Sequence, residues 1–128
     1  MPKVKQLTIP CENRPGTLAH VAKVLGDAKV NILSCLTTTS GNEGQAHAIV
    51  DNVNKAKKAL EAAGLSYTEA DVLQVELPNT PGALGRFAGK LAEKDINITL
   101  GYATGVKGSK KAGVVLAVSD LDKAARIR

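Results

Sequence analysis

Aromatic residues are almost absent from this sequence of 128 residues, in which Phe87, Tyr67 and Tyr102 stand alone and tryptophan is missing. A folded core must therefore be built from alanine, valine, leucine and isoleucine. The apolar content of 44% is sufficient for such a core, and it argues against a wholly disordered chain.

Cysteine and histidine are also scarce. Cys11 and Cys35 are the only cysteines, and they form no C-x-x-C pair of the kind that binds metals. Free thiols fit a reducing cytoplasm, so we expect a cytoplasmic protein without a metal site. His20 and His47 are the only histidines, and from them we propose no Ser-His-Asp set; we predict neither catalytic residues nor a cofactor.

Long apolar runs are missing as well. No stretch approaches the length that a membrane-spanning helix needs, and the first five residues lack the apolar segment of a signal peptide. We therefore expect no membrane partner. The net charge is +5, but the lysines are scattered, and the one basic cluster (Lys107, Lys110 and Lys111) lies in a glycine-rich segment. Charge alone is weak support for a nucleic-acid partner, so we expect none.

The strongest positive signal is an internal repeat. The six residues from Asn13 to Leu18 (Asn-Arg-Pro-Gly-Thr-Leu) recur 66 residues later, from Asn79 to Leu84 (Asn-Thr-Pro-Gly-Ala-Leu). The same offset aligns Leu7 with Leu73 and Asn31 with Asn97, and an offset of 68 aligns residues 50–56 with 118–124. Many matched positions in the same order indicate two copies of one domain, which we place at 1–70 and 71–128.

Both copies predict the same order of elements. A strand is expected at 5–11 and 72–77, and a helix opened by Pro15 and Pro81, because proline is well tolerated at the first helical position. Each helix carries a stripe of apolar residues predicted to be buried: Leu18, Val21, Ala22 and Leu25 in copy one, and Leu84, Phe87, Ala88 and Leu91 in copy two. Two strands follow, at 30–38 and 46–50 in copy one and at 96–104 and 113–118 in copy two. A second helix starts near 52–54, buries Ala56, Ala59, Leu60 and Ala63, and stops at Gly64, where a left-handed residue is wanted.

This order predicts an α+β protein made of two ferredoxin-like βαββαβ units. A last strand is expected at 66–70 in copy one, whereas the sequence ends inside the second helix of copy two. We therefore expect copy two to lack its last strand, with the sheet edge open, covered by a partner, or left bare by truncation.

The junction of the first strand and the first helix is the candidate binding site. Helix starts expose unpaired backbone N–H groups that attract carboxylates and phosphates, and Gly16 and Gly82 let a ligand approach that backbone. Asn13 and Asn79 stand just before, offering both a donor and an acceptor. Such a set could hold an amino-acid zwitterion. The same residues could equally build a turn and cap a helix, and that alternative stays open.

The motif from Cys11 to Leu18, followed by Val30-Asn31-Ile32 after the helix, resembles the ACT domain. It is particularly similar to the serine-binding regulatory domain of D-3-phosphoglycerate dehydrogenases, and the resemblance covers the chain twice. It implies that an amino-acid effector is held where two such domains pair. The implied ligand-binding positions are Cys11, Asn13, Arg14, Pro15, Gly16, Thr17, Leu18, Asn31 and Ile32 in copy one, and Asn79, Thr80, Pro81, Gly82, Ala83, Leu84, Asn97 and Ile98 in copy two.

One departure weakens serine as the ligand, because the serine-binding version has histidine where this chain has Cys11 and, in copy two, Leu77. The sequence therefore predicts a small regulatory protein, not an enzyme, that binds an amino acid or similar carboxylate. We expect a homodimer that acts on a regulated enzyme or regulator. A ligand-free subunit for oligomerisation or partner binding is the alternative. An RNA-binding protein is a weaker one, because segments such as Leu7–Ile9 carry no aromatic residues for base stacking.

Overall fold

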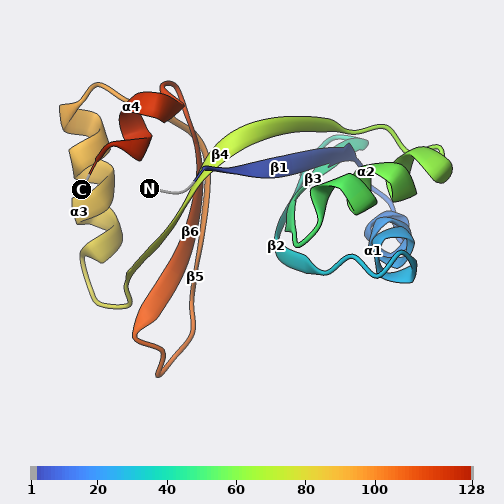
Figure 1. Cartoon of the computed structure of the whole chain (residues 1–128), viewed down its shortest axis with the longest axis horizontal. Helices are drawn as coiled ribbons and strands as arrows, with labels where there is room; N and C mark the ends of the chain where they lie inside the picture. The colour runs from blue at the N-terminus through green and yellow to red at the C-terminus, as the bar shows by residue number, and fades with distance from the viewer. Residues whose placement is uncertain (1–2, 128) are drawn as a thin grey trace. The chain divides into compact units, whose positions relative to one another are not determined.

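The computed structural model describes residues 3–127 (Figure 1). Its elements follow the duplicated order expected from the repeat. They are β1 (Lys3–Pro10), α1 (Thr17–Asp27), β2 (Ile32–Ser40), β3 (Glu43–Val50), α2 (Val53–Ala62), β4 (Thr68–Pro78), α3 (Ala83–Glu93), β5 (Ile98–Gly105), β6 (Lys111–Val118) and α4 (Leu121–Ala125). The α+β class and the two βαββαβ-like copies are confirmed.

The described chain forms two compact units. Lys5–Ala70 makes one of them, and Lys3 and Val4 group with the residues from Asp71 onward in the other. Strand β4 is continuous from Thr68 to Pro78, so it contributes residues to both units. The sequence predicted two separate strands at 66–70 and 72–77, and this was wrong. No glycine, proline or asparagine interrupts the segment, so nothing breaks the extended backbone there.

The unit Lys5–Ala70 has the strand order β2-β3-β1-β4. Strand β3 is antiparallel to both neighbours, with Ala48 opposite Leu7 of β1 and opposite Cys35 of β2. Helices α1 and α2 cover one face of this sheet (Figure 1), and the core between the layers contains Leu7, Ile9, Val21, Leu25, Ala46, Ala48, Val50, Ala56 and Leu60. The small alanines of β3 and α2 let the two layers approach closely.

The second unit repeats this arrangement with strands β4-β6-β5. Its core contains Leu73, Val75, Leu77, Ala83, Phe87, Leu91, Ile96, Val114, Leu116 and Ala124, so α3 and α4 pack on one face of the strands (Figure 1). Helix α4 is short, and no strand follows it among residues 126 and 127. Lys3 joins this unit through an ion pair in which its Nζ lies 2.5 Å from Asp122 Oδ1.

The helix stripes were only partly predicted correctly. Val21 and Leu25 of α1 and Phe87 and Leu91 of α3 are buried as expected. Leu18 and Leu84 are instead 42% and 48% exposed. Each lies in the first turn of its helix, on the side that faces solvent. Ala22, Ala59 and Ala88 are half-buried, and Ala63 is exposed beyond the end of α2.

The predicted end of α2 is confirmed, whereas the predicted first residues of α1 and α3 are wrong. Gly64 adopts a left-handed conformation (φ 71°) just after α2, as predicted for a helix end. Pro15 and Pro81, however, do not open the helices, which begin at Thr17 and Ala83. Gly16 and Gly82 stand at the N-caps with φ of 91° and 85°. A Pro-Gly turn thus precedes each helix, because glycine readily adopts the left-handed conformation that such a turn requires.

Among residues 3–127, no helix is both long enough and apolar enough to span a bilayer.

Candidate functional site

Asn13 ties the segment before α1 to the β2–β3 turn. Its side-chain Nδ2 donates to the carbonyl oxygen of Gly41 at 2.9 Å, and its backbone N–H donates to Asn42 O at 2.9 Å. Both bonds join segments 28 or 29 residues apart in sequence. The amide nitrogen of Asn13 therefore holds the β2–β3 turn in place. Its Oδ1 oxygen can still accept a hydrogen bond.

Asn79 does the same in copy two, with one more bond. Its Nδ2 donates to Val106 O at 3.0 Å and Ser109 O at 2.9 Å, and its backbone N–H donates to Lys110 O. This geometry fits the turn-building role that the sequence left open. The repeated asparagine thus fixes the hairpin turn against the first helix in each copy.

The space beside the N-cap glycine is empty at the start of α1, whereas a side chain lies there at the start of α3. A Cβ placed on Gly16 would meet no heavy atom within 4 Å. A Cβ on Gly82 would lie 2.8 Å from Nη1 of Arg86, so the arginine side chain occupies that space. Arg86 aligns with His20 of copy one by the offset of 66. The two helix starts therefore differ in the residue one turn into the helix, which is His20 in α1 and Arg86 in α3.

A cavity of about 300 Å³ lies at the open start of α1. The first backbone N–H groups of a helix have no partner within the helix, so they are available to an anion at this position. Arg14 adds a guanidinium, whose Nε is 2.9 Å from Glu12 Oε2. The lining residues are Pro10, Cys11, Glu12, Arg14, Pro15, Gly16, Thr17, His20, Val21 and Leu65. The cavity thus combines anion-attracting backbone groups with one carboxylate.

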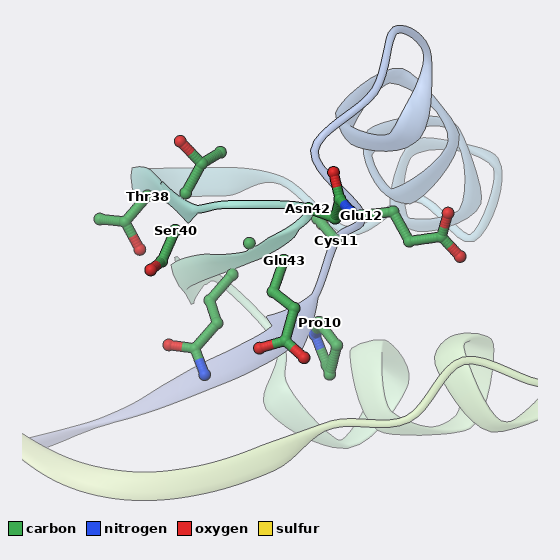
Figure 2. Close-up of a pocket in the computed structure, with 10 residues that line it drawn as sticks. Pro10, Cys11, Glu12, Thr38, Ser40, Asn42 and Glu43 are labelled. Carbon is green, nitrogen blue, oxygen red and sulfur yellow. The ribbon is translucent and has the colours of Figure 1, made fainter.

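A second cavity of about 510 Å³ adjoins the first and shares Pro10, Cys11 and Glu12 with it. It lies beneath the β2–β3 hairpin (Figure 2) and is also lined by Thr38, Thr39, Ser40, Asn42, Glu43, Gly44 and Gln45. In Figure 2 the side chain of Glu43 extends below the hairpin, whereas Glu12 points away from it. Hydroxyl, amide and carboxylate groups therefore line this space.

Asn31 and Asn97 lie just before β2 and β5 and do not line either cavity. The backbone N–H of Asn31 donates to Asp51 Oδ1 at 2.9 Å, and that of Asn97 donates to Ser119 Oγ at 2.8 Å. Their exposed side chains, and the half-buried Ile32 and Ile98 that follow, are separate from the helix starts within each unit. These bonds are made by the backbone N–H groups, so they hold each strand start without using the asparagine side chain.

The remaining predicted positions lie close to the helix starts. Thr17 Oγ1 donates to Glu12 O at 2.8 Å and so holds the turn before α1. In copy two, the backbone N–H of Ala83 donates to Thr80 O at 3.3 Å. Leu18 and Leu84 project into solvent beside the first turns. Within residues 3–127 no group of three or more His, Cys, Asp or Glu could hold a metal ion.

His47 is 9% exposed, and its Nδ1 lies 3.0 Å from Thr8 Oγ1 on the neighbouring strand. Burial lowers the pKa of His47, so its neutral form is favoured. The contact with Thr8 gives the buried imidazole of His47 a polar partner, so the residue has a structural role in the sheet.

Cys11 is the one buried thiol at the cavities. Burial raises its pKa, and the negative charge of an ionised Cys35 acts in the same direction, against a smaller opposing effect of a hydrogen bond from the Ala46 backbone. The thiolate is the reactive form, so Cys11 should be an unreactive thiol at neutral pH. Its side chain contributes an apolar wall to both cavities.

We therefore expect iodoacetamide to modify the exposed Cys35 at least roughly tenfold faster than Cys11 in the native protein at pH 7.5. Peptide mass spectrometry over time measures both rates in one sample. In guanidinium chloride the two rates should become similar, which is the internal control. Equal rates in the native protein would show that Cys11 is accessible and would contradict its burial.

The comparison with protein families agrees with the duplicated fold. The model of the ACT domain pair matches residues 2–128. The chain belongs to the ACT domain pair family. A solved structure, that of protein BT0572 from Bacteroides thetaiotaomicron, superimposes on this ACT domain pair with a TM-score of 0.90. The two are 31% identical, and the match covers 96% of this chain and 84% of that one.

More distant structures share the fold of this ACT domain pair. The regulatory subunit of aspartate kinase from Thermus thermophilus, in its ligand-free form, gives a TM-score of 0.72 at 18% identity, covering 95% of this chain and 87% of that chain. The same subunit from Thermus flavus gives 0.63 at 18% identity, covering 89% and 82%. No curated protein matches the sequence.

Two acidic residues at the cavities of this ACT domain pair were not predicted as site residues. Glu12 lies inside the motif that resembles the ACT domain. The repeat did not indicate a role for it, because the corresponding residue of copy two is Pro78. Glu43 follows a turn, where charged residues are usually only solvated. Only the return of the hairpin to the end of β1, through the bond from Cys11 N–H to Gly44 O, brings Glu43 to the site.

Proposed function

We propose that this chain is a regulatory, non-catalytic protein that binds an amino acid or a similar small carboxylate at the start of α1. The observation that carries the proposal is the 300 Å³ cavity in front of the open, glycine-capped helix start. The family supports the domain type, and the shared fold with regulatory subunits of aspartate kinase supports a regulatory protein. The resemblance to serine-binding domains leaves the identity of the amino acid open.

The ligand carboxylate is assigned to the first backbone N–H groups of α1 and to Arg14. A carboxylate at a helix start is stabilised by roughly 0.3–1 kcal/mol, and by up to about 2 kcal/mol when partly buried. The ammonium group of the ligand is assigned to Glu12, which lines the 300 Å³ cavity beside Arg14. Opposite charges of the site then match the two ends of a zwitterion.

Copy one is the preferred copy for this role. Its helix start is open, whereas Arg86 occupies the equivalent space at Gly82. An open, hydrated site with few charge contacts should bind in the micromolar to millimolar range, on the order of −4 to −8 kcal/mol. Such affinity suits a sensor, because metabolite concentrations can then change its occupancy.

Isothermal titration of the full chain against each of the twenty amino acids tests the proposal. We expect saturable binding of at least one of them, and we expect Arg14→Gln to weaken it about tenfold, because charge-assisted hydrogen bonds are strong. Lys58→Gln is the control, since it removes the same charge from the exposed side of α2 in the same unit. It should leave the affinity within about twofold.

Two results would contradict the proposal. One is an absence of binding for all twenty amino acids at about 10 mM, well above the expected dissociation constants. The other is binding that Arg14→Gln and Lys58→Gln weaken equally, because that would reflect net charge and not the start of α1.

A further inference from the structure

The cavity at the start of α1 contains apolar residues that the charged groups of an amino acid do not use. The ligand carboxylate is assigned to the first N–H groups of the helix and to Arg14, and the ammonium group to Glu12. The side chain of the ligand is left to contact the remaining lining residues, most of which are apolar. These apolar residues are Pro10, Cys11, Pro15, Val21 and Leu65.

Three of the apolar residues connect the cavity with the core of the first unit. Cys11 follows β1, Val21 lies in α1, and Leu65 follows α2. Cys11 is 5% exposed and Val21 is 4% exposed, and both belong to the core. Leu65 is half-buried and packs against the same core. The cavity therefore reaches the core through side chains that come from three separate elements.

The backbone at the end of α2 fixes the position of Leu65. The N–H of Leu65 donates to Leu60 O at 2.9 Å, and the N–H of Gly64 donates to Glu61 O at 3.0 Å. Gly64 is left-handed, with a φ of 71°. These features define a Schellman motif, in which the residue after the left-handed glycine makes an apolar contact with the helix. The end of α2 therefore holds Leu65 at the cavity, and no ligand is needed to place it there.

Few polar groups of the cavity are left for a ligand side chain. Glu12 and Arg14 pair with each other, with Oε2 and Nε 2.9 Å apart. The hydroxyl hydrogen of Thr17 is donated to Glu12 O at 2.8 Å. The exposed His20 is the remaining polar side chain of the lining. A polar ligand side chain placed against the apolar residues would lose hydrogen bonds to water and find few replacements, which is unfavourable.

We propose that the site at the start of α1 is selective for amino acids with an aliphatic side chain, such as valine and leucine. This inference rests on the proposed amino-acid binding and names the class of ligand. The aliphatic side chain packs on Cys11, Val21 and Leu65 and removes their remaining apolar surface from water, which is favourable. The volume of about 300 Å³ is at the lower end of the range for small-molecule sites, so it suits a single amino acid.

Isothermal titration of the full chain with ligands of nearly equal shape tests the selectivity. Valine is expected to bind at least about fivefold more tightly than threonine, because the hydroxyl of threonine loses hydrogen bonds to water against an apolar surface. Leucine should exceed asparagine by a similar factor. Leucine should also bind about tenfold more tightly than alanine, because each buried methylene group strengthens binding by up to roughly fourfold.

Leu65→Ala tests the assigned contact directly. It should weaken the binding of leucine about fivefold and that of alanine less than about twofold, because the methyl group of alanine is too short to make the same contact. Leu65→Met should preserve the preference for leucine, since methionine is apolar and similar in size. The matched control is Leu33→Ala, which makes the same truncation at an exposed position of β2 outside the cavity and should leave both affinities within about twofold. Thermal unfolding verifies that each variant is folded.

The possible outcomes separate the selectivity from the proposed function on which it rests. If none of the twenty amino acids binds at about 10 mM, the proposed function is wrong and the selectivity falls with it. If amino acids bind, but threonine and asparagine bind as tightly as valine and leucine, only the aliphatic selectivity is wrong. Equal weakening of leucine and alanine binding by Leu65→Ala would also overturn it, because Leu65 would then act on the fold of the site and not on the ligand side chain.

Discussion

Leu7→Ala is expected to lower the free energy of unfolding by about 2–5 kcal/mol, the range for truncating a buried leucine. Leu7 is 0% exposed at the centre of β1 and belongs to the core formed with α1 and α2. This core is built from small aliphatic residues, and the neighbouring alanines cannot expand to fill a cavity. The loss of dispersion contacts therefore adds to the loss of buried apolar area.

Urea unfolding at 25 °C, followed by circular dichroism, measures this change. Leu33→Ala is the matched control in the same unit, because Leu33 is 56% exposed on β2 and its truncation should cost less than about 0.5 kcal/mol. A cost below about 1 kcal/mol for Leu7→Ala would mean that β1 is not packed against the helices as described.

Gly44→Ala is expected to destabilise the protein by about 3 kcal/mol, at the upper end of the cost of overpacking. A Cβ at this position would lie 2.6 Å from Cys11 O and 2.9 Å from Thr38 O. Both are backbone atoms, so the strand ends themselves would have to move. The bond from Cys11 N–H to Gly44 O would be disturbed, together with the cavity that both residues line.

The same unfolding measurement compares Gly44→Ala with Gly113→Ala in β6, where a Cβ would meet nothing within 4 Å. Gly113→Ala should change stability by less than about 1 kcal/mol, and it removes the same conformational freedom from the unfolded chain. If the two variants are equally stable, the close approach of β1 to the hairpin is not present in solution. If an amino acid binds as proposed, Gly44→Ala should also weaken that binding, whereas Gly113→Ala should not.

The two copies differ in which strand of the hairpin carries the glycine that approaches the segment before the first helix. Gly44 faces Thr39 across the β2–β3 hairpin, whereas Ala112 faces Gly105 across β5–β6. A Cβ on Gly105 would come 2.9 Å from Asn79 Oδ1. Each hairpin therefore keeps one glycine where it approaches the loop before the first helix, but on opposite strands. The two copies therefore differ in the contacts between the hairpin and the segment before the first helix.

The sequence by itself determined the duplicated plan. Repeated spacing of proline, glycine and apolar residues indicated two copies with the same order of elements, because helix and strand periodicities and turn residues act over a few neighbours. It also identified Gly16, Gly82 and Asn13 as unusual positions. Local signals could not, however, say whether Asn13 would bind a ligand or hold a turn, because its partner Gly41 is 28 residues away.

Tertiary structure alone decided the features that depend on such distant partners. It fused two expected strands into β4, left Leu18 and Leu84 exposed, and placed Glu43 in the lining of a cavity near the end of β1. It also placed Arg86 over Gly82 and gathered Cys11, Val21 and Leu65 at one cavity. The physical reason is common to all of them: burial, cavity shape and charge proximity are set by which elements pack together, and a single sequence specifies that packing only through the complete fold.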